Sequence, residues 1–550
     1  MRREQIRIER SIRFKWFHWK ALIGFLGFLI LFALFYTHRI IKYQEPQFLT
    51  FRELKELSRN PYPGWFLERK LQHFWKTPII DNNAYYHGHG AAGRHPADQK
   101  LGKYLRLVSW NIEKSLHMAD AITAFSPAKK FEDIIDPSKA PPDSSFRHEI
   151  LRQREKLTNA DIIVLQEMDI GMKRSGYINA AGELAKALSM NYAYGAEQLE
   201  IDPVYLGLEK VYYTGGKVID QEQTDYYAVD PARYKGVFGC AVLSRYPIKY
   251  VRVFQLKNQG YNWYFGEKPK IGFVEKARRV GTEIIFENQL TREMKAGGRI
   301  FFRVDLTVPG LPEKTLTIIN VHLEIKCLPK AREAQMAEIL SYIKTIRHPV
   351  ILVGDFNSAP QDLSPTSAWR ITERLAKNPE TWFTVGTSAV LPHALAINTA
   401  RLVTKFTMDL QDPFAPNINV VLPNPVKPMF TMIEHFRFQD GGAFDFRGDG
   451  TRSVNGKEGI LANSNQRDLK GFKTTFSVKR PIAIVIGKYR LDWIFVKSFL
   501  KDPYDKTASF RFAPHFGETL EEMNTSLKVP ISDHHPNVVD IPFKEPKIKN

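Results

Sequence analysis

Eight polar side chains lie at or beside the ends of apolar segments in this 550-residue chain. They are Asn111, Glu167, His322, Asp355, Asn357, Asp492, Asp533 and His534. Each one alone has an ordinary explanation as a turn residue, a capping group or a hydrogen-bonded core residue. Their recurrence at strand ends indicates a shared site, and carboxylates that converge there would repel one another unless something compensated their buried charge. A divalent cation would remove this repulsion.

The residue types restrict the chemistry of such a site. Carboxylate and amide oxygens without thiolates suit a hard cation, so we expect Mg²⁺ as the cofactor, with Mn²⁺ as a substitute. A nearby histidine can donate a hydrogen bond to a phosphoryl oxygen, and an aspartate with an asparagine neighbour can hold and deprotonate an attacking water. Together these groups predict metal-assisted hydrolysis of a phosphate ester.

The elements that must position these residues follow from the hydrophobic pattern, which changes after residue 103 to strands that alternate with helices. We expect strands at 104–110, 161–167, 238–244 and 314–324, and in the segments "VILVGDFN", "YRLDWIFV" and "PISDHHPNVVDI". A helix is expected at 148–160. Another begins near Pro329 and carries one apolar face, formed by Met336, Ile339, Leu340 and Ile343.

Six motifs in a fixed order resemble a known superfamily. "SWNIE", "LQE", "NVHLE", "GDFNS", "LDWIF" and "SDHHP" are similar to the endonuclease/exonuclease/phosphatase superfamily, which includes DNase I, exonuclease III, abasic-site endonucleases, inositol phosphatases and neutral sphingomyelinases. The resemblance covers residues 104–543. It implies an α/β fold of the DNase I-like kind, a four-layer α/β/β/α sandwich with two mixed sheets face to face and the site at one rim.

The resemblance also implies roles for individual residues. Asn111, Glu167 and Asp533 would lie at the metal, and Glu113 is a further candidate to bind it or to support its ligands. His322 would contact the scissile phosphate. The resemblance implies that two further residues, Asp355 and Asn357, would act on the attacking water or the phosphate.

Asp355 would activate the nucleophilic water and Asn357 would position that water or the phosphate. Asp492 would pair with His534 and hold its imidazole, which stabilises the charged transition state. A carboxylate partner is expected to raise the pKa of His534 and favour its cationic form.

The N-terminal segment predicts a membrane anchor. Residues 21–36 carry no charge and, with the aromatic residues before them, would form roughly 31 Å of helix. No small-x-small cleavage site follows, and the segment is apolar all round, so an anchor is favoured over a cleaved signal peptide or a buried helix. Basic residues are more numerous before the span than after it, which predicts a cytoplasmic N-terminus and an extracytoplasmic catalytic domain, in the periplasm, a lumen or the cell exterior.

The domain organisation follows from these segments. We expect a basic cytoplasmic tail at 1–20, a transmembrane anchor at 21–37, an irregular tether and lead-in at 38–103, and a catalytic domain at 104–543. Insertions are expected near 255–300 and 400–470. The insertion between Asp355 and Asp492 is expected to be surface decoration, with a substrate-side loop as the alternative. The aromatic residues at 261–265 would pack under a sheet or contact lipid or bases.

Several observations bear on the substrate. The formal net charge of +19 suits an anionic partner such as nucleic acid or a phospholipid surface, although an evenly solvated basic surface would give the same value. "LVGDFNS" and "LDWIFV" differ from the inositol phosphatase signatures, which disfavours that subfamily. The chain has two cysteines, Cys240 and Cys327, which are too few for a disulfide framework but could form one disulfide bond. No protein partner is inferred.

The favoured prediction is a membrane-anchored, Mg²⁺-dependent phosphodiesterase that is either nuclease-like or phospholipase- or sphingomyelinase-like. The alternatives are a phosphomonoesterase and an inactive, tethered binding module.

Overall fold

The computed structural model describes residues 19–29, 40–89, 102–127, 130–201, 229–267, 294–358, 426–444, 475–482, 486–497 and 515–543. The chain divides into two compact units, Met1–Ile41 and Lys42–Asn550. In the first unit, residues 19–29 are helical and most of their apolar side chains are exposed. Within the described ranges, no helix combines the length and apolar character that crossing a membrane requires. Residues 30–37 of the predicted anchor lie outside the described residues.

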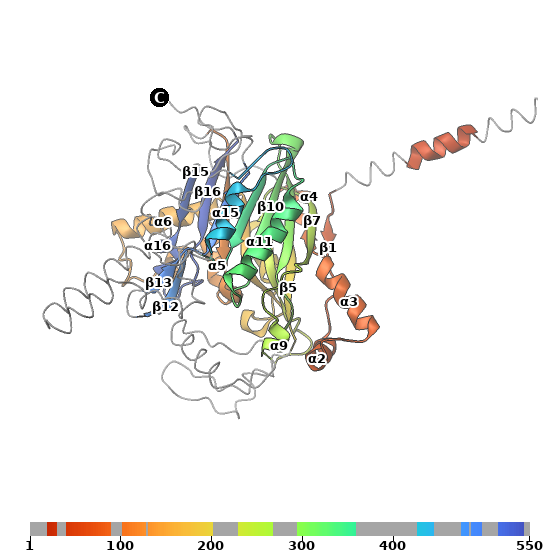
Figure 1. The fold of residues 1–550 in the computed structure, drawn as a ribbon. Helices are drawn as coiled ribbons and strands as arrows, with labels where there is room; N and C mark the ends of the chain where they lie inside the picture. Colours follow the sequence, from red (N-terminus) through yellow and green to blue (C-terminus); the bar gives the residue numbers. More distant parts are fainter. Residues whose placement is uncertain are drawn as a thin grey trace, which may run out of the picture. The chain divides into compact units, whose positions relative to one another are not determined.

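The second unit is built on two large β-sheets (Figure 1). The described residues form a nine-stranded sheet in the order β1-β2-β5-β6-β4-β3-β16-β15, with β8 paired to β5. Its strands are β1 (Tyr43–Gln44), β2 (Ile79–Asp81), β3 (Tyr104–Asn111), β4 (Ile162–Ile170), β5 (Asn191–Glu200), β6 (Val237–Ser244), β8 (Lys295–Gly297), β15 (His515–Thr519) and β16 (Asn537–Pro542).

The second large sheet has the order β14-β11-β10-β9-β7. Its strands are β7 (Ile248–Gln255), β9 (Ile300–Thr307), β10 (Thr315–His322), β11 (Val350–Asp355) and β14 (Asp492–Val496), and a separate pair is formed by β12 (Phe476–Ile482) and β13 (Ile486–Tyr489). Both large sheets are mixed, because β3 and β4 are parallel in one, β10 and β11 are parallel in the other, and the remaining pairs are antiparallel.

Ten helices of this unit lie in the described residues. They are α2 (Phe51–Arg59), α3 (Trp65–Lys76), α4 (Asn83–Tyr86), α5 (Met118–Phe125), α6 (Ser145–Thr158), α7 (Ala180–Leu188), α9 (Trp263–Glu267), α11 (Pro329–Ile343), α15 (Lys427–His435) and α16 (Glu521–Thr525). Short 3₁₀ turns occur at Glu113–Ser115, Phe131–Ile134, Lys173–Ser175 and Pro312–Lys314.

Three hydrophobic cores separate the layers of the second unit. The middle core lies between the two sheets, and it holds side chains from both, such as Val164 and Ile318. A second core lies under helices on the outer face of the first sheet, and a third lies under α11 and α15 on the outer face of the second. The arrangement is therefore helix, sheet, sheet, helix, which agrees with the mixed α/β fold that the motifs implied.

Strand β11 shows why the central strands have continuous apolar sequences. Successive side chains of a strand point to opposite faces. Ile351 and Val353 accordingly enter the middle core, whereas Val350 and Leu352 enter the outer core beneath α11. A strand covered on both faces needs apolar residues at every position. The strands expected at 104–110, 161–167, 238–244 and 314–324 are confirmed, as are both predicted helices.

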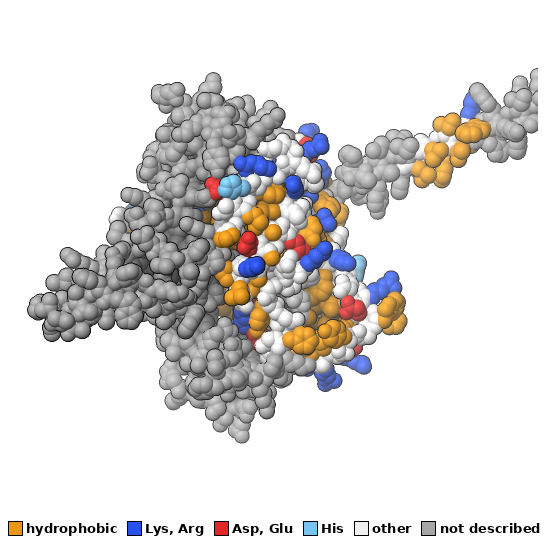
Figure 2. All heavy atoms as spheres, in the orientation of Figure 1, with side chains coloured by type: hydrophobic (Ala, Val, Ile, Leu, Met, Phe, Trp, Pro, Cys, Tyr) orange, Lys and Arg blue, Asp and Glu red, His pale blue; other side chains and the backbone are white. Residues whose placement is uncertain are grey.

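The lead-in differs from its prediction. Irregular structure was expected throughout 38–103, but α2 and α3 form there, and β1 and β2 extend the first sheet. Thr50 caps α2 in a capping box with Glu53, and the two helices bury Leu54 and Phe74. Their amphipathic pattern was obscured by the Pro- and Gly-rich turn between them. Figure 2 shows hydrophobic side chains on the surface of this region.

One predicted insertion also contributes to the core. Helix α15 lies within 400–470, and its residues Met429, Phe430 and Ile433 pack on the outer face of the second sheet. This part is not surface decoration, because its apolar face is needed to cover the sheet. The Pro-rich segment before residue 426 and the polar segment after residue 444 lie outside the described residues. Cys240 and Cys327 are not bridged.

Candidate active site

Strand register aligns three predicted residues on the second sheet. His322 on β10 is the partner of Asp355 on the parallel strand β11, and Asp355 is the partner of Asp492 on the antiparallel strand β14. On the first sheet, Asn111 ends β3 opposite Gln166 of β4, so Glu167 lies one position beyond it. Residues far apart in the sequence therefore meet at one end of the two sheets.

Gly354 allows the close approach of β10 and β11. Its φ is +139°, and a Cβ atom there would lie 2.0 Å from the carbonyl oxygen of Val321. Only glycine avoids this clash. The glycine of "GDFNS" therefore fixes the spacing that places His322 beside Asp355.

Three of the predicted residues have left-handed backbone conformations. The φ angles are +43° at Glu113, +59° at Glu167 and +47° at Asn357. Glu167 lies at an irregularity in the pairing of β4 with β6, which interrupts the regular alternation of its side chains. Such conformations are costly for residues other than glycine and cluster at functional sites.

Polar contacts join the two sheets at this end. Asn111 Nδ2 donates to Asp355 Oδ2 at 3.1 Å. One step deeper, Gln166 Nε2 donates to Asn320 Oδ1 at 2.8 Å, and Asn320 Nδ2 donates to the carbonyl of Leu165 at 3.0 Å. These buried bonds fix the distance between the rows of site residues.

His534 pairs with a buried carboxylate. Its Nδ1 lies 2.9 Å from Asp492 Oδ2, and its Nε2 lies 3.9 Å from Asp355 Oδ2. Burial acts to lower the pKa of His534, but Asp492 and Asp355 outweigh it and raise the pKa well above its ordinary value. The imidazole is therefore cationic at neutral pH. Trp110 Nε1 donates to the carbonyl of His534 at 3.0 Å and holds the loop in place.

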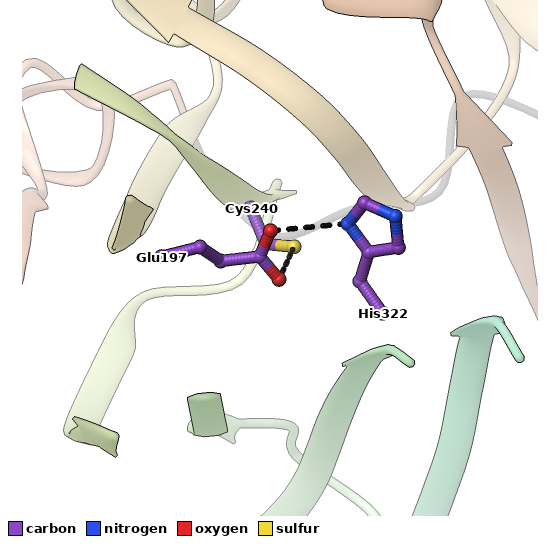
Figure 3. Close-up of side chains that lie close together, drawn as sticks. All are labelled: Glu197, Cys240 and His322. Atoms are coloured by element: carbon purple, nitrogen blue, oxygen red, sulfur yellow. Dashed lines mark hydrogen bonds and ion pairs between the residues drawn. The ribbon is translucent and has the colours of Figure 1, made fainter. Parts of the chain in front are cut away.

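His322 belongs to a different buried network, part of which is drawn in Figure 3. Its Nδ1 lies 3.1 Å from Glu197 Oε2 and 2.7 Å from Arg299 Nη1. Arg299 Nη1 also donates to Glu197 at 3.0 Å, and its Nε donates to Glu324 Oε2 at 3.2 Å. Burial acts to raise the pKa of Glu197, but His322 and Arg299 lower it overall. The thiol of Cys240 donates to Glu197 Oε1 at 3.4 Å.

Glu197, Arg299 and Glu324 were not predicted from the sequence. Glu197 lies inside a strand rather than at its end, and Arg299 follows a pair of glycines. For Glu197 and Arg299, the available signal was a charged residue within a segment that has to be buried, whereas Glu324 is the last residue of the motif "NVHLE". Such a residue needs a partner, but the sequence does not name it.

Among the described residues, two groups of side chains have the composition of a cation site. Ligand atoms of Glu197, Cys240 and His322 lie within 4.8 Å of one another, as do those of Asp355, Asp492 and His534. In the first group, the Arg299 guanidinium already contacts both Glu197 and His322. A second positive charge there would be repelled, so this group is a hydrogen-bonded network rather than a metal site.

Oxygen donors face the site from the first sheet. The side chain of Glu167 is 22% exposed, and its Oε1 lies 3.8 Å from His322 Nε2. Burial acts to raise the pKa of Glu167, but His322, Lys114, His534 and a hydrogen bond from Asn111 lower it. Glu167 is thus an ionised carboxylate beside an amide, which is a suitable donor set for a hard cation.

Glu113 and Asp533 lie next to these donors. The backbone N–H of Glu113 donates to Asn111 Oδ1 at 3.2 Å, and the backbone N–H of Asp533 donates to Glu113 Oε2 at 3.0 Å. Glu113 therefore supports both Asn111 and the loop that carries His534. The side chain of Asp533 is near enough to His534 to help raise its pKa.

Asp355 lies at the centre of the site. Its Oδ1 accepts from the backbone N–H of Asn357 at 2.7 Å, and burial is the largest of the effects that raise its pKa. Asn357 Nδ2 donates to the carbonyl of Leu323 at 2.9 Å. All eight predicted residues, together with Glu113, thus lie in one connected group, although their chemical roles stay predictions.

A sequence model of the Endonuclease/Exonuclease/phosphatase family matches residues 108–534. The match covers most of the chain, and the chain belongs to this family. Proteins of this family are hydrolases of phosphate esters and typically use divalent metals.

The chain is only distantly similar to solved structures. An endonuclease/exonuclease/phosphatase from Beutenbergia cavernae DSM 12333 is 15% identical, with 80% of this chain and 72% of that chain covered and a TM-score of 0.35. TDP2 of D. rerio, complexed with a single-strand DNA product, is 13% identical, with 80% and 99% covered and a TM-score of 0.34. A 3'-5' exonuclease (NExo) from Neisseria meningitidis is 13% identical, with 79% and 98% covered and a TM-score of 0.32. No curated protein matches the chain.

Proposed function

We propose that this protein is a Mg²⁺-dependent phosphodiesterase whose substrate is nucleic acid or a phospholipid headgroup. One observation carries the proposal. The Nε2 atoms of His322 and His534 both lie 3.9 Å from Asp355 Oδ2. This distance is too long for a direct hydrogen bond and leaves both ring nitrogens directed at the same small region beside a carboxylate. A phosphoryl oxygen in that region would receive hydrogen bonds from both histidines.

The donor chemistry fits a hard cation. Glu167 and Asn111 would hold the metal, with Asp533 at the rim, and none of these ligands is a thiolate. Asp492 Oδ1 is buried and has no hydrogen-bond partner among the described residues, so this part of the site contains negative charge that is not fully compensated. A bound cation would neutralise charge on the phosphate and on the leaving group.

The protein's own residues would perform the proton transfers. Asp355 is held by Asn111 and by the backbone of Asn357, and its raised pKa makes it a better base toward an attacking water. The amide nitrogen of Asn357 is engaged by a carbonyl, which leaves its side-chain oxygen to accept from that water. The cationic His534 would donate to the phosphoryl oxygen as negative charge develops there.

Membrane anchoring and topology are part of the proposal. Residues 21–37 would anchor the chain, with the N-terminus in the cytoplasm and the catalytic domain outside it. The charge bias around this segment supports the orientation, and the exposed apolar side chains of residues 19–29 support a lipid environment. A reporter fused after Asn550 tests the topology, and a reporter active in the cytoplasm would contradict it.

The activity is tested on a fragment that contains residues 42–550, the second compact unit. We expect Mg²⁺-dependent turnover of one substrate from a panel of plasmid DNA, RNA, sphingomyelin vesicles and inositol phosphates, together with a synthetic phosphodiester and the matching monoester. Asp355→Ala is expected to reduce turnover at least about 10³-fold, and EDTA to abolish it. Asp133→Ala, at an exposed position, is the matched control.

Each alternative predicts a different result. Preference for the monoester would identify a phosphomonoesterase. A folded fragment that binds Mg²⁺ but turns over nothing would favour the inactive binding module.

A further inference from the structure

The turn between α2 and α3 and the first residues of α3 expose large aromatic side chains. Tyr62, Trp65 and Phe66 are 75%, 65% and 83% exposed. Phe265 on α9 is 49% exposed, and α9 adjoins α2 because Tyr264 Oη donates to the carbonyl of Ser58 at 3.1 Å. We call Tyr62, Trp65, Phe66 and Phe265 the aromatic tip. Figure 2 shows hydrophobic side chains gathered over this end of the molecule. Soluble proteins rarely leave such a cluster uncovered unless it binds something.

Local hydrogen bonds and two prolines fix the turn that carries Tyr62. Asn60 Oδ1 accepts from the backbone N–H of Tyr62 at 3.0 Å, and Asn60 Nδ2 donates to the carbonyl of Tyr62 at 2.7 Å. Pro61 and Pro63 fix the φ angles on either side of Tyr62. The rings are presented on an ordered turn, so little conformational entropy is lost when they bind.

Positive charge surrounds the tip. Residues 51–76 contain six lysines or arginines and three glutamates. Arg59 and Arg69 are exposed, and the Arg69 guanidinium lies 5.5 Å from the centre of the Trp65 ring. Exposed aromatics beside cations are typical of segments that bind the interfacial region of an anionic bilayer.

Contacts connect the tip to the candidate active site. Trp263, on the same short helix as Phe265, donates from Nε1 to Glu324 Oε2 at 3.0 Å. Glu324 accepts from Arg299, which contacts His322. Binding of the tip to a surface would therefore also restrict the position of the residues around His322.

We propose that the aromatic tip inserts into the headgroup region of a lipid bilayer that contains anionic lipid. A protein partner would also cover apolar surface, but the combination of tryptophan, tyrosine and flanking cations matches the polar and apolar layers of a membrane interface. The proposal concerns binding, and it does not depend on the catalytic chemistry or on the N-terminal anchor.

Vesicle binding by residues 42–550 tests the proposal without the N-terminal segment. This fragment contains all three hydrophobic cores. We expect it to sediment with phosphatidylcholine vesicles that contain phosphatidylserine, and less with phosphatidylcholine alone. The double variant Trp65→Ser, Phe66→Ser is expected to bind at least about tenfold more weakly, because two large apolar side chains no longer leave water. Phe146→Ser, at an exposed position on α6, is the matched control and is expected to bind like wild type.

The outcomes separate lipid from other occupants. Quenching of Trp65 fluorescence by brominated lipid, measured as the difference between wild type and Trp65→Phe, would support insertion. Equal vesicle binding by wild type and the double variant would overturn the proposal. If the wild-type fragment were a dimer in lipid-free solution and the double variant a monomer, the proposal would also be overturned. The tip would then bind a second copy of the chain. Thermal unfolding of the double variant establishes that it is folded, and turnover of a soluble substrate keeps this test separate from that of the proposed function.

Discussion

The two buried histidines of the site differ in what lies behind each imidazole. His534 Nδ1 faces one carboxylate, Asp492, and a second carboxylate, Asp355, lies on its other side. His322 Nδ1 faces both the Glu197 carboxylate and the Arg299 guanidinium. His322 ends β10 and His534 lies in the loop just before β16. His534 is surrounded by negative charge, whereas His322 faces one carboxylate and one guanidinium.

This difference indicates different tasks for the two residues. The carboxylates around His534 keep it protonated, so it can bring positive charge to the phosphate. His322 Nδ1 cannot accept from Arg299 and donate to Glu197 at the same time, since arginine only donates. Its neighbours therefore select the tautomer and orientation of the ring. We infer that His534 contributes mainly charge and His322 mainly a directed hydrogen bond.

The largest expected effect follows from removing the charge behind His534. Asp492→Asn is expected to reduce kcat/KM about 10³ to 10⁴-fold, because the imidazolium loses its partner. The pKa of His534 would fall, so the loss of activity on the alkaline side of the pH profile should begin at lower pH. Measured pH profiles of the variant and of Asp133→Asn as a control test this. If the alkaline side of the pH profile of kcat/KM were the same in Asp492→Asn as in wild type, His534 would not be the group whose deprotonation reduces activity.

Removal of the carboxylate behind His322 is expected to have a smaller effect. Glu197→Gln should reduce kcat about 10 to 100-fold, because Arg299 still contacts the ring, and the alkaline limb should not move. Stability should fall by about 1–3 kcal/mol, since Glu324 is then the one carboxylate in the described part of the chain that still forms an ion pair with Arg299. Kinetics and urea unfolding, with the exposed Glu183→Gln as control, measure both quantities. A loss as large as that of Asp492→Asn would remove the distinction between the two histidines.

The His534 pair should also give stability a characteristic pH dependence. The folded-state pKa of His534 is raised above its unfolded value of about 6.5, so its contribution is fully present below that pH and is lost as pH rises through the folded-state pKa. The free energy of unfolding of wild type should therefore approach that of His534→Gln from about pH 6.5 upward. Urea unfolding over this range measures it, with His148→Gln on the surface of α6 as control. If the difference in the free energy of unfolding between wild type and His534→Gln increased with pH, the His534–Asp492 pair would not bind a proton on folding.

The smallest effect is expected at Cys240. Burial raises the pKa of this thiol well above its usual value, so it is not a thiolate at neutral pH. Cys240→Ala should change kcat less than about threefold and leave the Mg²⁺ requirement unchanged. Activity assays over a range of Mg²⁺ concentrations check this. A large loss of Mg²⁺ affinity would indicate that Glu197, Cys240 and His322 hold a cation after all.

Residues at strand ends could be predicted because their position has a physical reason. Asn111 and Asp355 end β3 and β11, and Glu167 ends the apolar run of β4, although that strand continues to Ile170 across an irregularity in its pairing. A strand buried on both faces is apolar along most of its length, so these three residues stand out in the sequence. Glu197 and Arg299 do not, because their proximity depends on how β5 of one sheet approaches β9 and β10 of the other. That approach is a property of three-dimensional packing.

The fold was predictable to a similar extent. Continuous apolar runs identified β3, β4, β6, β10 and β11, and one apolar face identified α11. The α2–α3 pair was missed because its turn contains Pro61, Pro63 and Gly64, which suggest irregular structure when the flanking amphipathic pattern is short. Helix α15 was missed for a related reason, since it follows a Pro-rich segment and becomes apparent only through its packing on the second sheet.

The position of β16 has a consequence for biosynthesis. This strand, Asn537–Pro542, lies between β3 and β15, and the loop just before it carries His534. Asn111 and Glu167 leave the ribosome long before that loop, because translation adds only about 5–20 residues per second. A nascent or prematurely terminated chain would hold the oxygen donors of the first sheet without the imidazolium or the strand that completes that sheet. An unfinished chain of this kind would therefore lack the activity that we propose until the loop with His534 and β16 had been added.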